Sequence, residues 1–240
     1  MKVSSVVKRY VASIEDATVP FVYFIWTFIA FVTLRNFLEL FSDTPSAAEI
    51  PFTAHLHFYL FYICVALTMM LLFSAATGEE VPKTARLILA SYFFVLLAPI
   101  LDLIISRGQG YDMAYLLPHE HGNLLRRYLT FGGSFEGGGI TIGLKLEGAI
   151  VLLASFFYFR AKGASLLRSL FFLLAIYTTV FLYAIVPFVV KGFLDLWGIF
   201  EGFSDELMIK FYLIVATILL LTVVWIWDRR RFLDVLGVAR

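Results

Sequence analysis

Long apolar stretches separated by short polar segments dominate the pattern along this chain. Six of them are long enough to cross a membrane as helices, which takes about 20 residues. They cover residues 19–41, 57–77, 87–106, 144–159, 169–190 and 207–227. The runs are continuous rather than alternating, which indicates helices and not the strands of a membrane barrel. The pattern therefore predicts an all-α polytopic integral membrane protein, with six transmembrane helices in a single domain over residues 1–240.

The fourth stretch is the least regular of the six. Only Gly148–Phe159 is free of charge, so this span either includes Lys145 and Glu147 or is a shorter, partly re-entrant element. The segment before it, Arg107–Gly143, is long and rich in glycine. Loops of this length are usually functional or disordered. We expect it to be re-entrant in part, or to carry a short interfacial helix over Asn123–Phe131.

An amphipathic pattern precedes the first apolar stretch, within residues 1–16. Apolar residues recur there every three or four positions, and lysine, arginine and serine fill the opposite face. The apolar face consists of Val3, Val6, Val7, Tyr10, Val11 and Ile14. This pattern predicts a helix that anchors the chain on the cytoplasmic membrane surface. Docking of the helix to a partner protein is the alternative.

Composition narrows the class of protein further. Apolar residues make up 61% of the chain and charged residues 15%, against about 45–50% and about 25% in soluble domains. A soluble protein of this size has too little interior to hide so many apolar side chains. The net charge of +1 gives no argument for a nucleic-acid partner. The single cysteine, Cys64, excludes a disulfide within the chain.

Lysine and arginine are distributed unevenly among the connections between the stretches. Twelve of the 19 fall in the N-terminal segment, the second–third and fourth–fifth connections, and the tail of residues 228–240, whereas the alternate connections hold four. Basic segments tend to stay on the cytoplasmic side of a membrane. We therefore expect a multi-pass protein of the cytoplasmic membrane with cytoplasmic N- and C-terminal segments.

Ionisable residues inside the stretches gather in their outer, extracytoplasmic parts. They are Arg35, Glu39, Asp102, Lys145, Glu147 and, at the start of the sixth stretch, Lys210. A charge in hydrocarbon costs about 2.5–3.5 kcal/mol on insertion scales, so it needs a partner or a role. Arg35 and Glu39 are one helical turn apart and can pair. A bend at Pro99 would let Asp102 turn toward Arg35 or Lys145. Structural ion pairs are the alternative to a binding site.

The buried charges and two arginines of the glycine-rich segment form two sets of candidate site residues. An anionic group could be held by Arg35, Lys145, Arg126 and Arg127, because charge-assisted hydrogen bonds are strong in a low-dielectric site. Acid–base chemistry could use Asp102, Glu147 or Glu39, because apolar surroundings favour the neutral form of a carboxyl group. Backbone N–H groups that follow Thr141 offer a further contact for an anion.

Four histidines lie toward the same side, in two His-x-His pairs. They are His55, His57, His119 and His121. Neutral imidazoles bind transition metals, but residues two apart on a helix point in different directions. Haem bound through His57 would need a second axial histidine, which no other stretch provides. The sequence therefore leaves the cofactor unknown, with a metal ion or haem as options.

Together these features predict a protein that binds an anionic or lipid-linked ligand at the outer leaflet and can catalyse group transfer on it. Membrane lipid is then its expected partner. The alternative is a non-enzymatic anchoring subunit of a larger membrane complex, of respiratory type, with haem or quinone nearby. A transporter fits less well, because transporters place ionisable residues near the midplane and often show internal repeats.

Overall fold

The computed structural model describes residues 5–42, 52–110, 124–131, 140–198 and 204–238. All regular structure within these ranges is helical, and a 3₁₀ segment, η1 (Tyr92–Leu96), joins α4 to α5. In chain order the helices are α1 (Ser5–Glu15), α2 (Phe21–Ser42), α3 (Phe52–Thr77), α4 (Val81–Ser91), α5 (Leu97–Ile105), α6 (Leu124–Leu129), α7 (Ile142–Ala161), α8 (Leu166–Leu196), α9 (Ser204–Trp227) and α10 (Arg229–Val238).

Six helical segments within the described ranges are long and apolar enough to cross a membrane. They are α2, α3, the α4–η1–α5 unit, α7, α8 and α9. The six spans expected from the apolar stretches are therefore confirmed as helices. The side of the membrane that each end faces stays a prediction.

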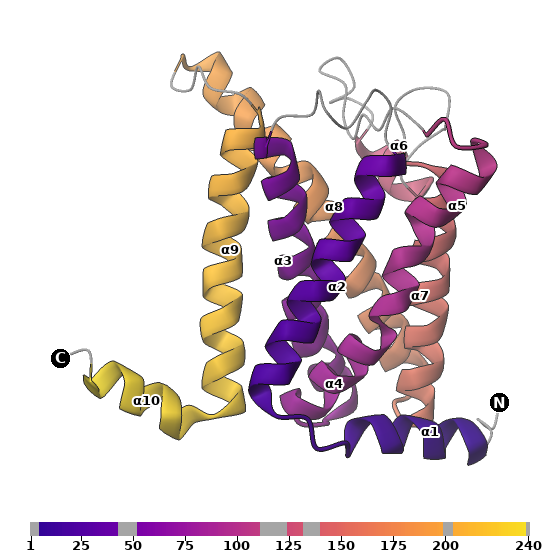
Figure 1. Ribbon diagram of the computed structural model, residues 1–240, viewed down its shortest axis with the longest axis vertical. Helices are drawn as coiled ribbons and strands as arrows, with labels where there is room; N and C mark the ends of the chain where they lie inside the picture. Colours follow the sequence, from indigo (N-terminus) through magenta and orange to yellow (C-terminus); the bar gives the residue numbers. More distant parts are fainter. Residues whose placement is uncertain (1–4, 43–51, 111–123, 132–139, 199–203, 239–240) are drawn as a thin grey trace.

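The spanning helices run up and down in alternation and form one bundle (Figure 1). Helices α1 and α10 lie across the same end of the bundle, which we call the terminal end. The start of α7 and the short helix α6 lie at the opposite end, which we call the far end. Helix α3 packs against α2, α4, α8 and α9, while α5 packs against α2 and α7. The far end corresponds to the side that the sequence predicts to be extracytoplasmic.

The third span is broken where the sequence predicts a bend. Pro99 lies in the first turn of α5, and a proline ring clashes with the carbonyl group four residues earlier. The 3₁₀ segment η1 absorbs this clash, because the Leu97 N–H bonds to the carbonyl of Phe94, three residues back. The tighter turn leaves the next N–H group, that of Ala98, without its α-helical acceptor. That group is used in the charged core described below.

Several helices begin at residues other than the first residue of the apolar stretch, because a side-chain cap, and not hydropathy, sets where the helix begins. Helix α7 begins at Ile142, and the Thr141 hydroxyl accepts the Leu144 N–H at 3.1 Å. The fourth span is therefore a full-length helix that includes Lys145 and Glu147, not a shorter re-entrant element. The Ser165 hydroxyl likewise caps α8, whose bounds, Leu166–Leu196, exceed the predicted 169–190.

Helix α1 lies within residues 1–16, where the sequence predicts an amphipathic surface helix. Its last turn is packed against the bundle, and its role as a membrane-surface anchor stays a prediction. Val11 and Ile14 lie on an apolar cluster that includes Phe159 of α7. Val6 and Tyr10 point outward and are 63% and 66% exposed. Helix α6 (Leu124–Leu129) lies within Asn123–Phe131, where the sequence predicts a short helix; its position at a membrane interface stays a prediction. Residues 111–123 and 132–139 of the glycine-rich segment lie outside the described residues.

Candidate functional site

Four charged side chains from three spanning units are buried together in the far-end half of the bundle. Arg35 on α2 is 0% exposed, Asp102 on α5 2%, Glu39 on α2 4% and Glu147 on α7 9%. We call these four residues the charged core. All four lie in the outer parts of the spans, as the sequence predicts. The charged core thus holds one guanidinium group and three carboxyl groups in an apolar interior.

Arg35 is the centre of this core. Its guanidinium group forms an ion pair with Glu39, one helical turn away, as their spacing predicts. A second nitrogen lies 3.9 Å from a carboxylate oxygen of Glu147. The ring of Tyr62 on α3 lies 5.0 Å from the guanidinium carbon, within the range of a cation–π contact. Arg35 therefore links α2 to α7 and α3.

Glu147 is held by the break in the third span. Its carboxylate accepts the N–H of Ala98 at 3.2 Å, which satisfies the donor that the 3₁₀ segment released. Its side chain is 12% exposed, compared with 6% for Glu39 and 0% for Arg35. Glu147 is thus the most accessible member of the Arg35–Glu39–Glu147 cluster.

Asp102 has different partners from those we expected. Its carboxylate accepts a hydrogen bond from the Thr141 hydroxyl and the N–H of Gly143, the latter at 2.9 Å. The described residues place no ion pair between Asp102 and Arg35 or Lys145, so the expectation that Asp102 turns toward one of them was wrong. The backbone N–H groups of a helix start attract an anion. The anion that meets the start of α7 is the protein's own carboxylate.

The close contact between α5 and α7 depends on Gly143. A Cβ atom at this position would lie 2.3 Å from the Ala98 carbonyl oxygen and 2.7 Å from the Asp102 carboxyl group. Real side chains essentially never approach a backbone atom this closely. Glycine therefore lets Asp102 reach the start of α7, which explains the Thr-x-Gly sequence there.

A tyrosine hydroxyl next to the core has no hydrogen-bond partner among the described residues. Tyr92 is 4% exposed, and its hydroxyl oxygen is buried. Its ring packs against Phe28 and Phe31. The η1 segment that carries Tyr92 packs against α2 and α7, the helices of Arg35 and Glu147. Buried polar groups without a partner are rare and call for an explanation. No sequence pattern distinguishes Tyr92 from the other tyrosines of the apolar stretches.

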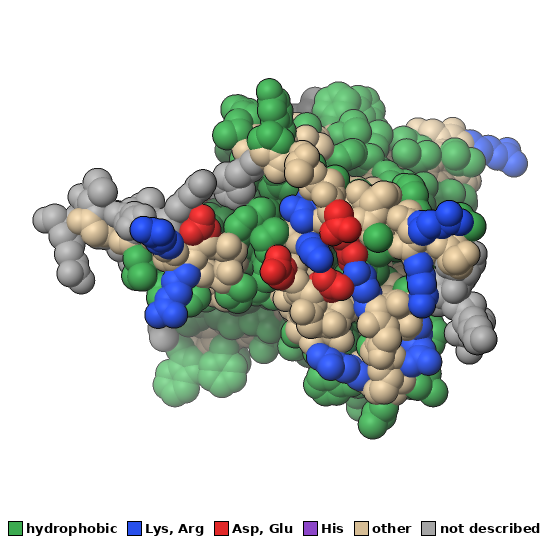
Figure 2. Space-filling model, turned by 90° about the horizontal axis from the view of Figure 1, so that it is seen from below, with side chains coloured by type: hydrophobic (Ala, Val, Ile, Leu, Met, Phe, Trp, Pro, Cys, Tyr) green, Lys and Arg blue, Asp and Glu red, His purple; other side chains and the backbone are tan. Residues whose placement is uncertain are grey.

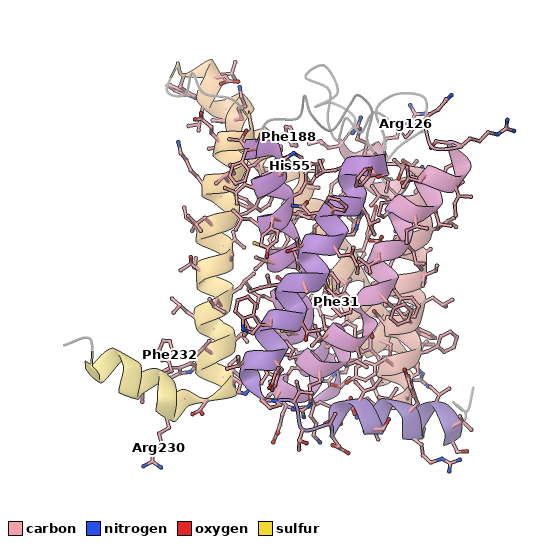
Figure 3. The ribbon with its side chains drawn as sticks, in the orientation of Figure 1. Phe31, His55, Arg126, Phe188, Arg230 and Phe232 are labelled. Carbon is pink, nitrogen blue, oxygen red and sulfur yellow. The ribbon has the colours of Figure 1, made fainter. Side chains whose placement is uncertain are left out.

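Three basic candidates lie at the far end outside the core, and we call them the basic rim. Lys145 is half-buried on the first turn of α7, two residues from Glu147. On α6, Arg126 is exposed at the top of the bundle (Figure 3), whereas burial lowers the pKa of the Arg127 guanidinium group. Helix α6 is fixed to α8, because the Tyr128 and Thr178 hydroxyls are 2.7 Å apart.

The two described histidines lie on α3. His55 is half-buried and His57 is buried. His57 lines a small pocket between α3, α8 and α9, together with Phe58, Phe61, Ala184, Phe188, Met208 and Tyr212. Within the described ranges no group of three or more His, Cys, Asp or Glu residues could hold a metal ion. The other two candidates, His119 and His121, lie outside these ranges.

A second charged cluster, which sequence reasoning missed, lies at the terminal end. Glu15 of α1 is only 2% exposed. Its carboxylate accepts a hydrogen bond from the Tyr158 hydroxyl at 2.7 Å and pairs with Lys162. Lys162 also contacts Glu79 at 2.8 Å, and Glu79 lies 3.5 Å from Lys83. We call these five residues the Glu15 clasp.

The clasp perturbs the ionisation of its members. The hydrogen bond from Lys162 holds the pKa of Glu79 below its ordinary value, despite partial burial of the carboxyl group. For Lys162, burial acts to lower the pKa, but the hydrogen bonds to Glu15 and Glu79 outweigh it and raise the pKa. Figure 2 shows acidic side chains at the centre of this end, with basic ones around them.

Comparison with known proteins adds no assignment. No protein-family model, no curated protein and no solved structure matches this chain. Function therefore has to be argued from the geometry of the site.

Proposed function

We propose that this chain is an integral membrane protein that binds the polar group of an anionic or lipid-linked ligand in the far-end half of its bundle. The proposal places that half on the extracytoplasmic side of the cytoplasmic membrane. The basic rim binds the anionic group first, and the charged core exchanges a proton with the ligand. Group transfer on the ligand is the reaction class that such a site could serve.

The observation that carries the proposal is the unmatched polar chemistry of the core. Arg35 balances Glu39, and the start of α7 compensates Asp102. Glu147 then remains with one backbone N–H and a distant guanidinium group, at 3.9 Å. A proton on Glu147 would leave the core with one net negative charge, that of Asp102 at the start of α7, and such a carboxylic acid can donate to a bound ligand. The Tyr92 hydroxyl, with no partner among the described residues, belongs to the η1 segment that packs against α7, the helix of Glu147.

Lys145 connects the rim with the core. It lies two residues from Glu147 on α7, so the two side chains leave the helix on different sides. One side chain is half-buried and the other is buried, in agreement with that spacing. An anionic group on the rim would therefore lie within two helical turns of the core. Arg35 has no exposed surface, so we assign it to holding the core together and not to first contact with the ligand.

Tyr92→Phe separates a ligand site from a purely structural core. If the hydroxyl contacts nothing, its removal should leave stability unchanged or raise it, because an unpaired buried polar group is unfavourable. Under the proposal, protein purified in mild detergent should also retain less ligand, as measured by native mass spectrometry. Tyr212→Phe is the matched control, since that hydroxyl donates to the Tyr183 carbonyl at 2.8 Å. It should lose about 0.5–1.5 kcal/mol of stability but keep the ligand.

The rim is tested in the same way. Lys145→Gln with Arg126→Gln should reduce the retained anionic lipid or lipid-linked ligand, because both cations lie at the far end. Arg107→Gln with Lys191→Gln removes the same charge outside the rim and should retain it. Identical sets of bound molecules in wild type, rim variant and control would contradict the proposal.

The orientation of the chain has its own test. A cysteine at Thr130, exposed at the far end, should react with an impermeant thiol reagent added to intact cells. A cysteine at Ala161, at the terminal end, should react only after permeabilisation. The native Cys64 is 0% exposed and gives no background. Labelling of Ala161→Cys in intact cells would reverse the proposed orientation.

The His57 pocket favours a second candidate function, that of an anchoring subunit associated with a quinone. Aromatic and apolar side chains line this pocket, and His57 is its only imidazole among the described residues. Quinone head groups suit such a site, because they stack on rings and accept one or two hydrogen bonds. Haem suits it less, since the one other described histidine, His55, lies two residues away on the same helix. Organic extraction of purified protein followed by mass spectrometry would reveal the quinone, and His57→Ala should remove it while His55→Ala should not.

A further inference from the structure

Two helices at the terminal end lie outside both the bundle and the charged core. Helices α1 and α10 run across the bundle axis, on opposite sides of it (Figure 1). Helix α1 packs mainly on α4, and α10 packs mainly on the end of α9. Both lie at the level where the spanning helices end. In a membrane that level is the interface between hydrocarbon and head groups.

The outward part of α1 combines apolar and basic side chains. Val6, Val7 and Tyr10 are 63%, 45% and 66% exposed, and they lie on one side of the helix. Lys8 and Arg9 are exposed on its other sides. The Glu15 clasp fixes the last turn of α1 to the bundle. The first turns are therefore held at the level where the spanning helices end, with their apolar side chains exposed.

Helix α10 repeats this arrangement at the other edge. In Figure 3, Phe232 lies on the side of α10 that is turned toward the spanning helices. Arg230 lies on the opposite side and points away from the bundle. The ring of Phe232 meets that of Trp225 on α9 at 5.4 Å, and the Arg229 guanidinium group lies 4.7 Å from the Trp225 ring. Tryptophan and arginine side chains of this kind mark membrane interfaces.

The charges of this end favour an anionic occupant. Lys8, Arg9, Arg229 and Arg230 are exposed. Among the acidic side chains of this end, Glu15 and Glu79 are paired with Lys162, Asp16 lies 3.7 Å from Lys83, and Glu80 is exposed. Figure 2 shows lysine and arginine side chains toward both edges of this face, around a central acidic group. Six membrane-spanning helices already require lipid at this level. Lipid with anionic head groups therefore fits both the apolar and the basic side chains.

We propose that α1 and α10 form one surface that binds the anionic lipid head groups of the leaflet at the terminal end. Val6, Val7, Tyr10 and Phe232 enter the apolar layer, while Lys8, Arg9, Arg229 and Arg230 contact the phosphates. This inference does not depend on the proposed ligand site, which lies at the opposite end of the bundle.

The full-length protein in mild detergent is titrated with short-chain phosphatidylglycerol and, in a separate experiment, with short-chain phosphatidylcholine. Binding is followed by the fluorescence of the native tryptophans. Wild type should bind phosphatidylglycerol more tightly. A cation at a membrane surface contributes about fivefold to binding of anionic lipid. Lys8→Gln with Arg9→Gln should therefore reduce the affinity for phosphatidylglycerol by about tenfold or more and leave phosphatidylcholine unchanged, as should Arg229→Gln with Arg230→Gln.

Two further variants make the outcome decisive. Arg107→Gln with Lys191→Gln removes two far-end cations and should keep the wild-type preference. Tyr10→Ser keeps every charge and should weaken both lipids equally. The proposal is overturned if wild type shows no preference for phosphatidylglycerol, or if the far-end control loses as much affinity as the α1 variant. Loss of the far-end ligand in the rim variants would not affect these results.

Discussion

Buried charges fasten the bundle at both of its ends, but the two clusters are built differently. In the Glu15 clasp, two carboxylates, Glu15 and Glu79, face two amines, Lys162 and Lys83. In the charged core, one guanidinium group is buried with three carboxyl groups, of which Arg35 pairs with Glu39 and Glu147. The clasp is balanced by its own side chains. The core also uses backbone N–H groups, that of Gly143 for Asp102 and that of Ala98 for Glu147.

The surroundings of the two clusters differ as well. The Lys162 and Glu79 side chains of the clasp are 17% and 26% exposed, so water screens them in part. Arg35 has no exposed surface, and uncompensated charge in such a place is expensive. The balanced cluster at the terminal end holds α1 to the bundle.

Removal of Arg35 should have the largest effect. Arg35→Leu leaves the carboxylates of Glu39 and Glu147 without their cation, and loss of one partner of a buried pair costs about 3–5 kcal/mol. Unfolding of purified protein in detergent would measure this loss. Lys162→Leu is the matched variant in the clasp and should cost less, because Lys162 is partly exposed. Equal losses would remove the contrast between the two clusters.

A double-mutant cycle locates the partner of Arg35. Arg35→Leu with Glu39→Leu should be less destabilising than Arg35→Leu alone, because the pair disappears together. Arg35→Leu with Asp102→Leu should be closer to additive, since Asp102 bonds to Thr141 and Gly143 instead. A larger coupling of Arg35 with Asp102 than with Glu39 would contradict the observed contacts.

Gly143→Ala should have the next largest effect. The new methyl group would meet the backbone oxygen of Ala98 at 2.3 Å, so α5 and α7 would have to separate. Overpacking of this kind costs about 1–3 kcal/mol. Gly148→Ala is the control on the same helix, because its methyl group would meet the far end of the Phe131 ring at 2.8 Å, which can move. The loss at Gly143 should exceed the loss at Gly148 in the same unfolding assay.

Asp102→Asn should have a smaller effect, which isolates the charge at the start of α7. The amide keeps one acceptor for the Gly143 N–H but loses the favourable charge at the helix start, worth up to about 2 kcal/mol. Thermal unfolding with and without Thr141→Ala would show whether the two changes couple. Fully additive losses would mean that Thr141 and Asp102 do not act as one cap.

Acid should weaken the clasp by the smallest amount. The pKa of Glu79 is lowered in the folded protein, so its contribution is present above the usual carboxyl pKa of about 4.3. That contribution is lost as pH falls through the lowered value. Glu79→Gln should reduce the loss of stability between pH 5 and pH 2.5, by less than about 1 kcal/mol. The neighbouring Glu80→Gln, exposed and outside the clasp, should keep the wild-type pH profile.

The same clasp should respond to alkali in the opposite sense. The pKa of Lys162 is raised by its two carboxylate partners, which outweigh burial. Its contribution is therefore complete below the usual lysine pKa of about 10.4 and is lost as pH rises through the raised value. Lys162→Gln should flatten the stability profile above pH 10. An unchanged profile in this variant would mean that the clasp does not carry the alkaline transition.

The amino-acid sequence by itself determined the class of the protein, its six spans and the level of its buried charges. Each of these depends on local quantities, namely the length of an apolar run and the cost of a charge within it. The Arg35–Glu39 pair could be predicted for the same reason, since one helical turn separates the two residues. The break before Pro99 followed from the chemistry of proline alone.

Only the tertiary structure decided which groups meet. Asp102 finds the start of α7 because Gly143 lets two helices approach, and no local pattern records that distance. Glu15 lies outside every apolar stretch, so its burial depends on docking of α1 against Tyr158 and Lys162, more than 140 positions away along the chain. Tyr92 looked like one aromatic residue among many until packing buried its hydroxyl beside Arg35. Pairing and burial between distant segments are properties of the packed bundle, whereas spans and their charges are properties of the chain.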